Sequence, residues 1–236
     1  MLDTAKTVRE IAVEMPQATR VFEKLGIDYC CGGLKSLDEA CAAANLRVGE
    51  VLQSLEAADK AAPEQDWKSG ELGELIAHIV RKHHAYVKSE VPRLEALIAK
   101  VCGVHGKNHP ELLEVQNVFR ALGGELSMHL MKEENILFPY VVRMEEAVRL
   151  GQPSIRPPFG SVENPIHMML MEHDSAGDAL RELRRLTNDY AAPADACISY
   201  QTLYRALLEF EADLHQHIHL ENNILFPRAI AMEGGK

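Results

Sequence analysis

The fold of this chain is decided by the stretch His129-Leu130-Met131-Lys132-Glu133-Glu134-Asn135-Ile136-Leu137-Phe138-Pro139. It recurs as His217-Ile218-His219-Leu220-Glu221-Asn222-Asn223-Ile224-Leu225-Phe226-Pro227, with seven of the eleven positions identical. His84 precedes the first copy by 45 residues, and His173 precedes the second copy by 44 residues. Each half of the chain therefore reads His, about 45 residues, and then His-x-x-x-Glu, which indicates an internal structural repeat.

The spacing within the repeat predicts which side chains meet. Residues four apart lie on the same face of a helix, so the His and the Glu of each copy point the same way. A gap of about 45 residues suits an antiparallel helical hairpin, which brings the upstream His beside its His-x-x-x-Glu partner. Helical bundles hold pairs of metal ions between such facing helices. The sequence therefore predicts a two-metal site built from His84, His129, Glu133, His173, His217 and Glu221.

The donor set favours iron. Imidazole suits iron, zinc, copper and nickel, and carboxylates suit harder ions. If both glutamates bridge, each ion receives two nitrogens and two oxygens, and an oxo or hydroxo bridge adds a fifth ligand. An octahedral iron then keeps one exchangeable position, whereas a structural zinc site closes at four ligands. We expect two non-haem iron ions. Solvated His and Glu on amphipathic helices are the alternative, which is typical of a single motif but not of a matched pair.

The hydrophobic periodicity predicts an all-α protein. We expect a small helical domain at 1–60, a linker at 61–66 and a four-helix bundle at 67–236. Pro139 and Pro227 are expected to stop the second and fourth long helices, because proline lacks the backbone N–H that a helix needs. The four long helices are predicted at Glu71–Val101, Pro110–Phe138, Pro165–Asp189 and Asp195–Phe226.

Composition excludes several classes of function. The 236 residues include 25 Lys and Arg against 35 Asp and Glu, a formal net charge of −10, which argues against nucleic-acid binding. The sequence has no run of about 20 apolar residues, as a membrane span requires, and its acidic start is unlike a signal peptide. We therefore expect a cytoplasmic protein without membrane or nucleic-acid partners.

Cys30 and Cys31 are adjacent and are followed by Gly32-Gly33. Neighbouring Cα atoms lie about 3.8 Å apart, too close for a relaxed disulfide. The remaining uses are thiol exchange or another redox role, contact with a metal or cluster, and pairing between two copies in a homodimer. A loop position favours reactivity over burial, and two ordinary small residues are the alternative. The scattered cysteines, Cys41, Cys102 and Cys197, are expected to be packing residues.

Several other polar residues lie near the predicted ligands. His78 and His167 each precede a predicted ligand by six residues, so they are either its hydrogen-bond partners or packed and surface histidines. Glu125 lies one turn before His129 and is a candidate proton relay. Glu172 adjoins His173 with an uncertain orientation. Solvation is the simpler expectation for both glutamates.

The cysteine motif Asp28-Tyr29-Cys30-Cys31-Gly32-Gly33, followed by the duplicated His…His-x-x-x-Glu…Phe-Pro pattern, resembles the iron–sulfur cluster repair di-iron proteins. These form the repair-of-iron-centres family of the YtfE/ScdA/DnrN type. The resemblance covers essentially the whole chain. It implies a di-iron centre in a hemerythrin-like four-helix bundle, with the six residues named above as iron ligands, both glutamates bridging, and Cys30 and Cys31 matching the family's cysteine pair.

The resemblance also implies a function in stress response. Family members restore iron–sulfur clusters damaged by nitric oxide or oxidants, so damaged iron–sulfur proteins are the expected clients, and nitric oxide or oxygen the expected small ligands. Iron donation from a labile site is the leading hypothesis. Nitric oxide reduction to nitrous oxide, or a sensing module, are alternatives. Oxygen-carrying hemerythrins use more histidines, so the symmetric set here argues against simple oxygen carriage.

Overall fold

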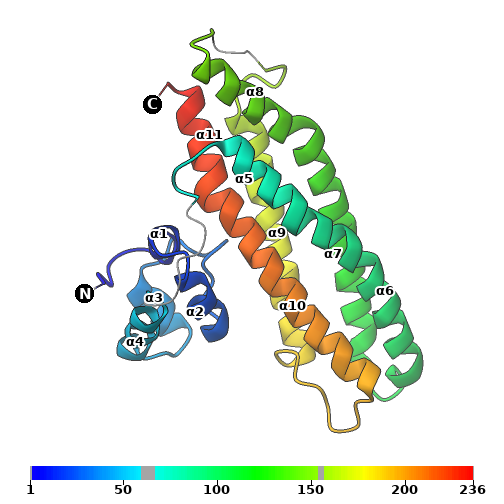
Figure 1. Ribbon diagram of the computed structural model, residues 1–236. Coiled ribbons are helices and arrows are strands. Elements are labelled where there is room, and N and C mark those ends of the chain that lie inside the picture. Colours follow the sequence, from blue (N-terminus) through cyan, green and yellow to red (C-terminus); the bar gives the residue numbers. More distant parts are fainter. Residues whose placement is uncertain (1, 60–66, 154–156, 236) are drawn as a thin grey trace.

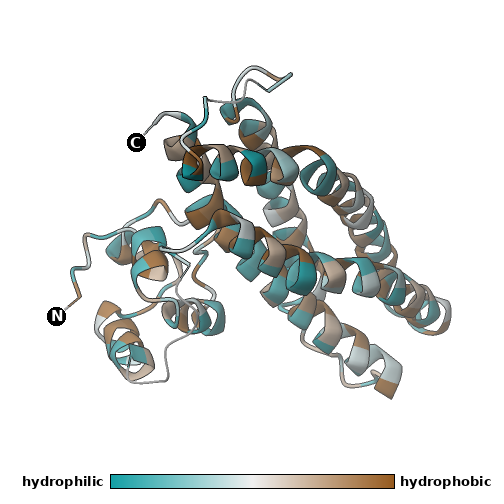
Figure 2. Ribbon diagram, turned by 45° about the horizontal axis from the view of Figure 1, so that its top comes forward, coloured by the Kyte–Doolittle hydropathy of each residue, from teal (hydrophilic) through white to brown (hydrophobic). Residues whose placement is uncertain are grey.

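Four long helical stretches run side by side and form the bundle in Figure 1. The computed structural model describes residues 2–59, 67–153 and 157–235. Each long helix carries an apolar side and a polar side (Figure 2), as a bundle requires. The first stretch is α5 (Leu72–Ile79), η1 (Val80–His84) and α6 (Ala85–His105), the second is α7 (Glu111–Lys132), η2 (Glu133–Leu137) and α8 (Phe138–Arg149), the third is α9 (Glu163–Thr187), and the fourth is α10 (Ile198–Leu220), η3 (Glu221–Leu225) and α11 (Phe226–Glu233).

Three of the four stretches contain a short π-helical turn, labelled η. Two of these turns coincide with the repeated motif, since η2 and η3 each begin at the Glu of His-x-x-x-Glu. The wider turn shifts the helix register by one residue, and such turns are frequent at functional sites. Asn135 supports the first of them, because its Nδ2 donates to the carbonyl oxygen of Met131 at 2.7 Å.

The predicted stops at Pro139 and Pro227 were wrong. Both helices continue beyond the proline, as α8 and α11. Each proline follows a π-turn and lies in the first turn of the next α-helical segment, where its missing N–H is not needed. The repeated Asn-Ile-Leu-Phe-Pro therefore marks a change of helical register and not a helix end.

The N-terminal helices are α1 (Val8–Glu14), α2 (Ala18–Leu25), α3 (Leu37–Ala43) and α4 (Val48–Asp59). Capping boxes begin α1 and α3, with Thr7 paired to Glu10 and Ser36 paired to Glu39, and such reciprocal bonds satisfy the backbone N–H groups at a helix start. Phe22 and Tyr29 are buried in the core of these helices. Figure 1 shows the four N-terminal helices beside the bundle, on the side of α9 and α10.

Within the described ranges the chain has no strand and only one isolated bridge, between Thr7 and Ser36, so the all-α prediction is confirmed. The expected linker at 61–66 lies outside the described residues, and the division at 1–60 and 67–236 stays a prediction. Among the helices that the structure describes, none combines the length and the hydropathy that crossing a membrane requires.

The apolar core of the bundle is divided in two. One cluster, including Phe119 and Phe210, fills the half of the bundle that contains α6 and α7. A second cluster, including Phe138 and Phe226, fills the half near the C-terminus. The repeated motif supplies residues to both, since the clusters meet at its His and Glu positions. A layer of buried polar side chains therefore separates two apolar cores.

Candidate metal centre

The six predicted ligands converge in this polar layer. They come from all four helical stretches, and all are buried. They form two groups of potential metal ligands, each with its ligand atoms within 4.8 Å of one another. The first group is His84, Glu133, His217 and Glu221, and the second is His129, Glu133, His173 and Glu221. Both groups contain the same two glutamates, as a pair of neighbouring cations requires.

The histidines pair differently from the prediction that each upstream histidine lies beside the histidine of its own hairpin, because each pair combines one helix of the first hairpin with one of the second. The Nε2 atoms of His84 and His217 lie 3.1 Å apart, and those of His129 and His173 lie 3.0 Å apart. Two ligands each about 2.1 Å from one ion and at right angles to each other are about 3.0 Å apart, and 2.1 Å is typical of imidazole on a divalent metal. The four imidazoles are therefore paired at the separation that a shared cation would give them.

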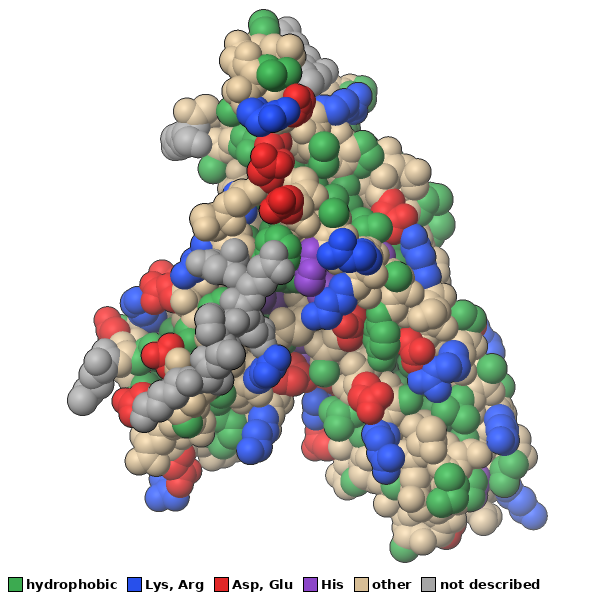
Figure 3. Space-filling view, viewed as in Figure 1, with side chains coloured by type: hydrophobic (Ala, Val, Ile, Leu, Met, Phe, Trp, Pro, Cys, Tyr) green, Lys and Arg blue, Asp and Glu red, His purple; other side chains and the backbone are tan. Residues whose placement is uncertain are grey.

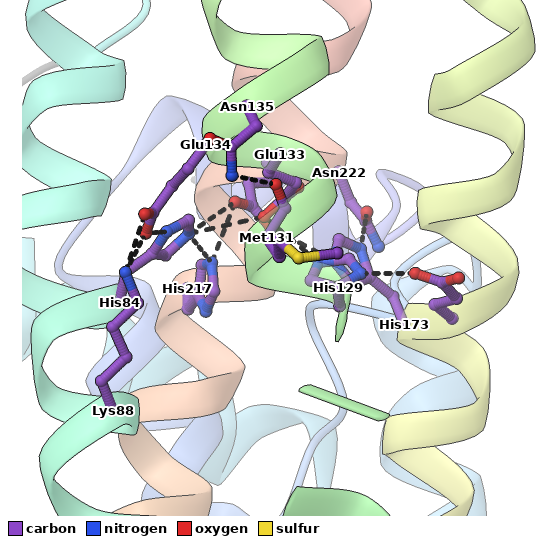
Figure 4. Close-up of polar contacts among 12 residues, drawn as sticks. His84, Lys88, His129, Met131, Glu133, Glu134, Asn135, His173, His217 and Asn222 are labelled. Atoms are coloured by element: carbon purple, nitrogen blue, oxygen red, sulfur yellow. Dashed lines mark hydrogen bonds and ion pairs between the residues drawn. The ribbon is translucent and has the colours of Figure 1, made fainter. Parts of the chain in front are cut away.

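The two glutamates lie between the histidine pairs. Glu133 Oε2 is 3.4 Å from His84 Nε2 and 3.3 Å from His129 Nε2. Glu221 uses one oxygen for each pair, with Oε1 at 2.9 Å from His217 Nε2 and Oε2 at 3.2 Å from His173 Nε2. Figure 4 shows Glu133 between the two groups of histidines. Each carboxylate thus lies within 3.4 Å of both histidine pairs.

Unsatisfied polar atoms indicate that the site is built for cations. Both oxygens of Glu133 and Oε2 of Glu221 are buried without a hydrogen-bond partner among the described residues. Burying a carboxylate in this way is costly unless it is paired or coordinates a metal. The chemistry of the donor set, with imidazole nitrogens and carboxylate oxygens, suits iron. The residues present therefore fit a pair of iron ions.

Three of the four histidines are oriented through Nδ1 by residues that sequence reasoning did not assign. His84 Nδ1 contacts Glu134 Oε1 at 2.8 Å, and His129 Nδ1 contacts Glu172 Oε2, also at 2.8 Å. His173 Nδ1 contacts Asn222 Oδ1 at 2.7 Å. These partners fix which ring nitrogen faces the centre. The interactions of His84 with Glu134 and of His173 with Asn222 are drawn in Figure 4.

Lysines hold the two carboxylate partners. Lys88 Nζ donates to Glu134 at 2.6 and 2.7 Å, and Lys132 pairs with Glu172. The expectation that Glu172 is simply solvated was therefore wrong. For the other two partners the repeat held a signal. Glu134 and Asn222 occupy the same position in its two copies, directly after the Glu of His-x-x-x-Glu.

Glu125, the candidate proton relay, is exposed and accepts a hydrogen bond from Ser175 Oγ at 3.1 Å. No contact in the described part of the chain joins it to the six ligands, and the relay role stays a prediction. His167 is exposed, and His78 packs against the Trp67 ring with centroids 4.9 Å apart. These two histidines are thus surface and packing residues and do not position the ligands.

Cys30 and Cys31 lie beside the same site. Cys30 is only 5% exposed and packs into the bundle core, so the loop buries one thiol, contrary to expectation. The neighbouring Cys31 thiol and burial raise the pKa of Cys30. Cys31 is partly exposed, and its Sγ lies 3.6 Å from the carbonyl oxygen of His173. Of the scattered cysteines, Cys41 is buried as expected, whereas Cys197 is exposed.

The second copy of the repeat forms hydrogen bonds with the cysteine loop. Asn223 Nδ2 donates to the carbonyl oxygen of Tyr29 at 2.9 Å, and Asn222 Nδ2 donates to that of Cys30 at 3.4 Å. Arg9 donates from Nη2 to the carbonyl oxygen of Asn222 at 3.1 Å. The η3 turn thus contacts the N-terminal helices on one side and carries Glu221 on the other.

Without a cation, the site holds protons. Burial disfavours the charged form, but contacts with Glu133 and Glu221 outweigh it and raise the pKa of His84 to about 10. Burial is likewise outweighed at His129, where Glu133 raises the pKa to about 9. One protonated imidazole therefore faces each metal position at neutral pH. A cation must displace that proton before it binds.

We expect metal affinity to rise with pH. Each ion displaces one proton, from His84 or His129, so each association constant should increase about tenfold per pH unit up to about pH 9. Calorimetric titration of the metal-free protein with ferrous iron under anaerobic conditions, in two buffers of different ionisation enthalpy, measures the protons released. A pH-independent affinity with no proton release between pH 6.5 and 8.5 would contradict this.

Comparison with known proteins agrees with the geometry. Residues 75–229 match the family described as hemerythrin HHE cation binding domain, and residues 4–59 match ScdA_N, a domain of unknown function. A probable iron-sulfur cluster repair protein of Haemophilus influenzae is 38% identical over 94% of this chain and 95% of its own. Proteins called iron-sulfur cluster repair protein YtfE, from Pectobacterium atrosepticum and Escherichia coli O81, are 35% and 36% identical over 97% and 95% of this chain and 98% and 96% of their own.

Proposed function

The chain belongs to the iron–sulfur cluster repair proteins, with an ScdA-type N-terminal domain and a hemerythrin HHE domain, and from this premise we propose that it repairs damaged iron–sulfur clusters by supplying iron. The observation that carries the proposal is the pair of four-residue groups sharing Glu133 and Glu221. Two ferrous ions held there are cargo for clusters that have lost iron. Client proteins are iron–sulfur proteins damaged by oxidants or nitric oxide.

The residues support reversible binding. Four neutral imidazoles and two carboxylates give each ion four protein ligands, fewer than the six of an octahedral ion. His84 and His129 take up protons when iron leaves, because the neighbouring glutamates keep their pKa values near 10 and 9. Reprotonation returns two of the four positive charges that leave with two ferrous ions. The site can therefore exist in both loaded and empty forms.

The cysteine pair is proposed to act as a thiol or redox partner beside this store. Cys31 is the partly exposed member, so exchange with an external thiol would begin there. Cys30 stays protonated because the adjacent thiol and burial raise its pKa. The contact of Cys31 Sγ with the carbonyl oxygen of His173, a proposed metal ligand, supports this role.

Iron transfer tests the proposal. Full-length protein loaded anaerobically with ⁵⁷Fe is mixed with an apo-ferredoxin and a sulfide source, and cluster formation is followed by absorbance and Mössbauer spectroscopy. Wild type should load the acceptor with ⁵⁷Fe, and His129→Ala should lower the transfer at least tenfold. His167→Ala, at an exposed histidine, is the matched control. Equal transfer by wild type and His129→Ala at unchanged fold would remove the proposal.

Nitric oxide reduction is a second candidate, and the two glutamates shared by both groups of potential ligands support it, since the two proposed cations would be neighbours. Bound ferrous ions would supply the electrons and the open coordination positions for this reaction. The reduced protein is exposed to nitric oxide without oxygen, and the headspace is assayed for nitrous oxide. An absence of nitrous oxide removes this candidate and leaves iron donation.

A further inference from the structure

The two proposed metal positions differ in the hydrogen bonds that orient their histidines. Each position has one histidine oriented by a glutamate, His84 by Glu134 and His129 by Glu172. The other histidine of the second position, His173, is oriented by Asn222. The other histidine of the first position, His217, has a buried Nδ1 without a hydrogen-bond partner among the described residues.

The internal repeat shows how this difference arises. The repeat places Asn222 where the first half has Glu134, and it places His83 where the second half has Glu172. Glu172 accepts a hydrogen bond from His129. His83, at the equivalent position of the other half, does not accept one from His217. Its ring stacks on that of His217, with centroids 5.7 Å apart and planes 8° apart. Stacked rings direct their hydrogen-bonding nitrogens away from each other's Nδ1.

His83 is engaged elsewhere. Its Nδ1 contacts Asp213 Oδ1 at 2.9 Å. It also lines a cavity of about 250 Å³ between the N-terminal helices and the bundle, together with His78, Lys82 and His219. In Figure 3 a histidine side chain and Lys or Arg side chains come to the surface where the N-terminal helices meet the bundle. His83 is therefore occupied by Asp213, whereas Glu172 contacts His129 and is paired with Lys132.

We propose that the ion held by His84 and His217 is the labile one, and that the ion held by His129 and His173 is retained. This rests on the proposed function of iron donation. Residues that orient metal-bound histidines contribute about 10–100-fold each to metal affinity. One position has two such residues and the other has one, so their release rates should differ by about that factor. Asn222 further ties the retained position to the cysteine loop through the carbonyl oxygen of Cys30.

Release kinetics test the assignment. The full-length protein loaded with two ferrous ions is mixed anaerobically with excess ferrozine, and the coloured chelate is followed by stopped flow. Wild type should release iron in two phases of about one ion each, with rates about 10–100-fold apart. Asn222→Ala removes the partner of His173 and should bring the slow phase close to the fast one. Single-phase release of both ions by wild type overturns the proposal.

Matched substitutions assign the phases. Glu134→Gln should accelerate the fast phase alone, and Glu172→Gln should accelerate the slow phase alone. The opposite assignment, or an Asn222→Ala variant that changes only the fast phase, overturns the proposal. Circular dichroism and initial iron content confirm that each variant is folded and loaded, and the glutamine variants keep the test decisive if Asn222→Ala does not fold. Transfer to apo-ferredoxin is scored separately, so iron donation can fail while the two release rates still differ.

Discussion

Replacing Glu221 by alanine should empty both metal positions at once. Glu221 has one oxygen beside each histidine pair, so its loss takes a ligand from both ions. It also removes one of the two predicted carboxylate ligands, which offset the positive charge of the two ferrous ions. We expect the iron content to fall from about two ions per chain to well below one. Elemental analysis after anaerobic reconstitution and desalting measures this directly.

A second variant and a control make this result specific. Glu221→Gln keeps the volume of the side chain but removes its charge, so it should lose both ions as well. Glu209→Ala changes an exposed glutamate of the same helical stretch, within α10, and should keep both ions. Retention of one tightly bound ion by Glu221→Gln would show that Glu221 serves a single position and does not bridge.

Removing the metal should destabilise the whole bundle. The ligands form a polar layer between two apolar clusters and join all four helical stretches. An ion that binds only the folded chain stabilises it by about 4 kcal/mol at a concentration 1,000-fold above its Kd. For a chain of this size, each kcal/mol corresponds to about 2–4 °C in Tm. We expect chelation to lower Tm by roughly 10 °C, measured by circular dichroism.

The size of this effect should depend on pH. The pKa of His84 is raised from its ordinary 6.5 to about 10 in the metal-free fold. Its protonation therefore stabilises the metal-free protein fully below pH 6.5, and this contribution is lost as the pH rises through 10. The difference in Tm between loaded and chelated protein should thus be larger at pH 8.5 than at pH 6.5. As a control, the Tm of Glu221→Gln should not respond to chelator. A chelated wild type as stable as the loaded form would contradict the prediction.

Local periodicity and repetition in the sequence determined the helical class and the candidate ligand set. His-x-x-x-Glu places both side chains on one helix face whatever surrounds it, because α-helical geometry is local. Duplication of the motif at matched distances from His84 and His173 then leaves antiparallel hairpins as the simple arrangement. The structure brings these six side chains together in two overlapping groups.

Tertiary structure decided what the two copies do differently. Asn135, in the first copy, donates to the carbonyl oxygen of Met131 in its own helix. Its counterpart Asn223 donates to the carbonyl oxygen of Tyr29, because the second copy lies against the N-terminal helices. Glu172 and His83 occupy equivalent places in the repeat, yet only Glu172 orients a ligand. Such differences depend on contacts between residues far apart in the chain, which local spacing does not encode. The sequence alone thus predicts a nearly symmetric pair of metal positions, and packing of the cysteine loop and of His83 against the second copy gives their histidines different hydrogen-bond partners.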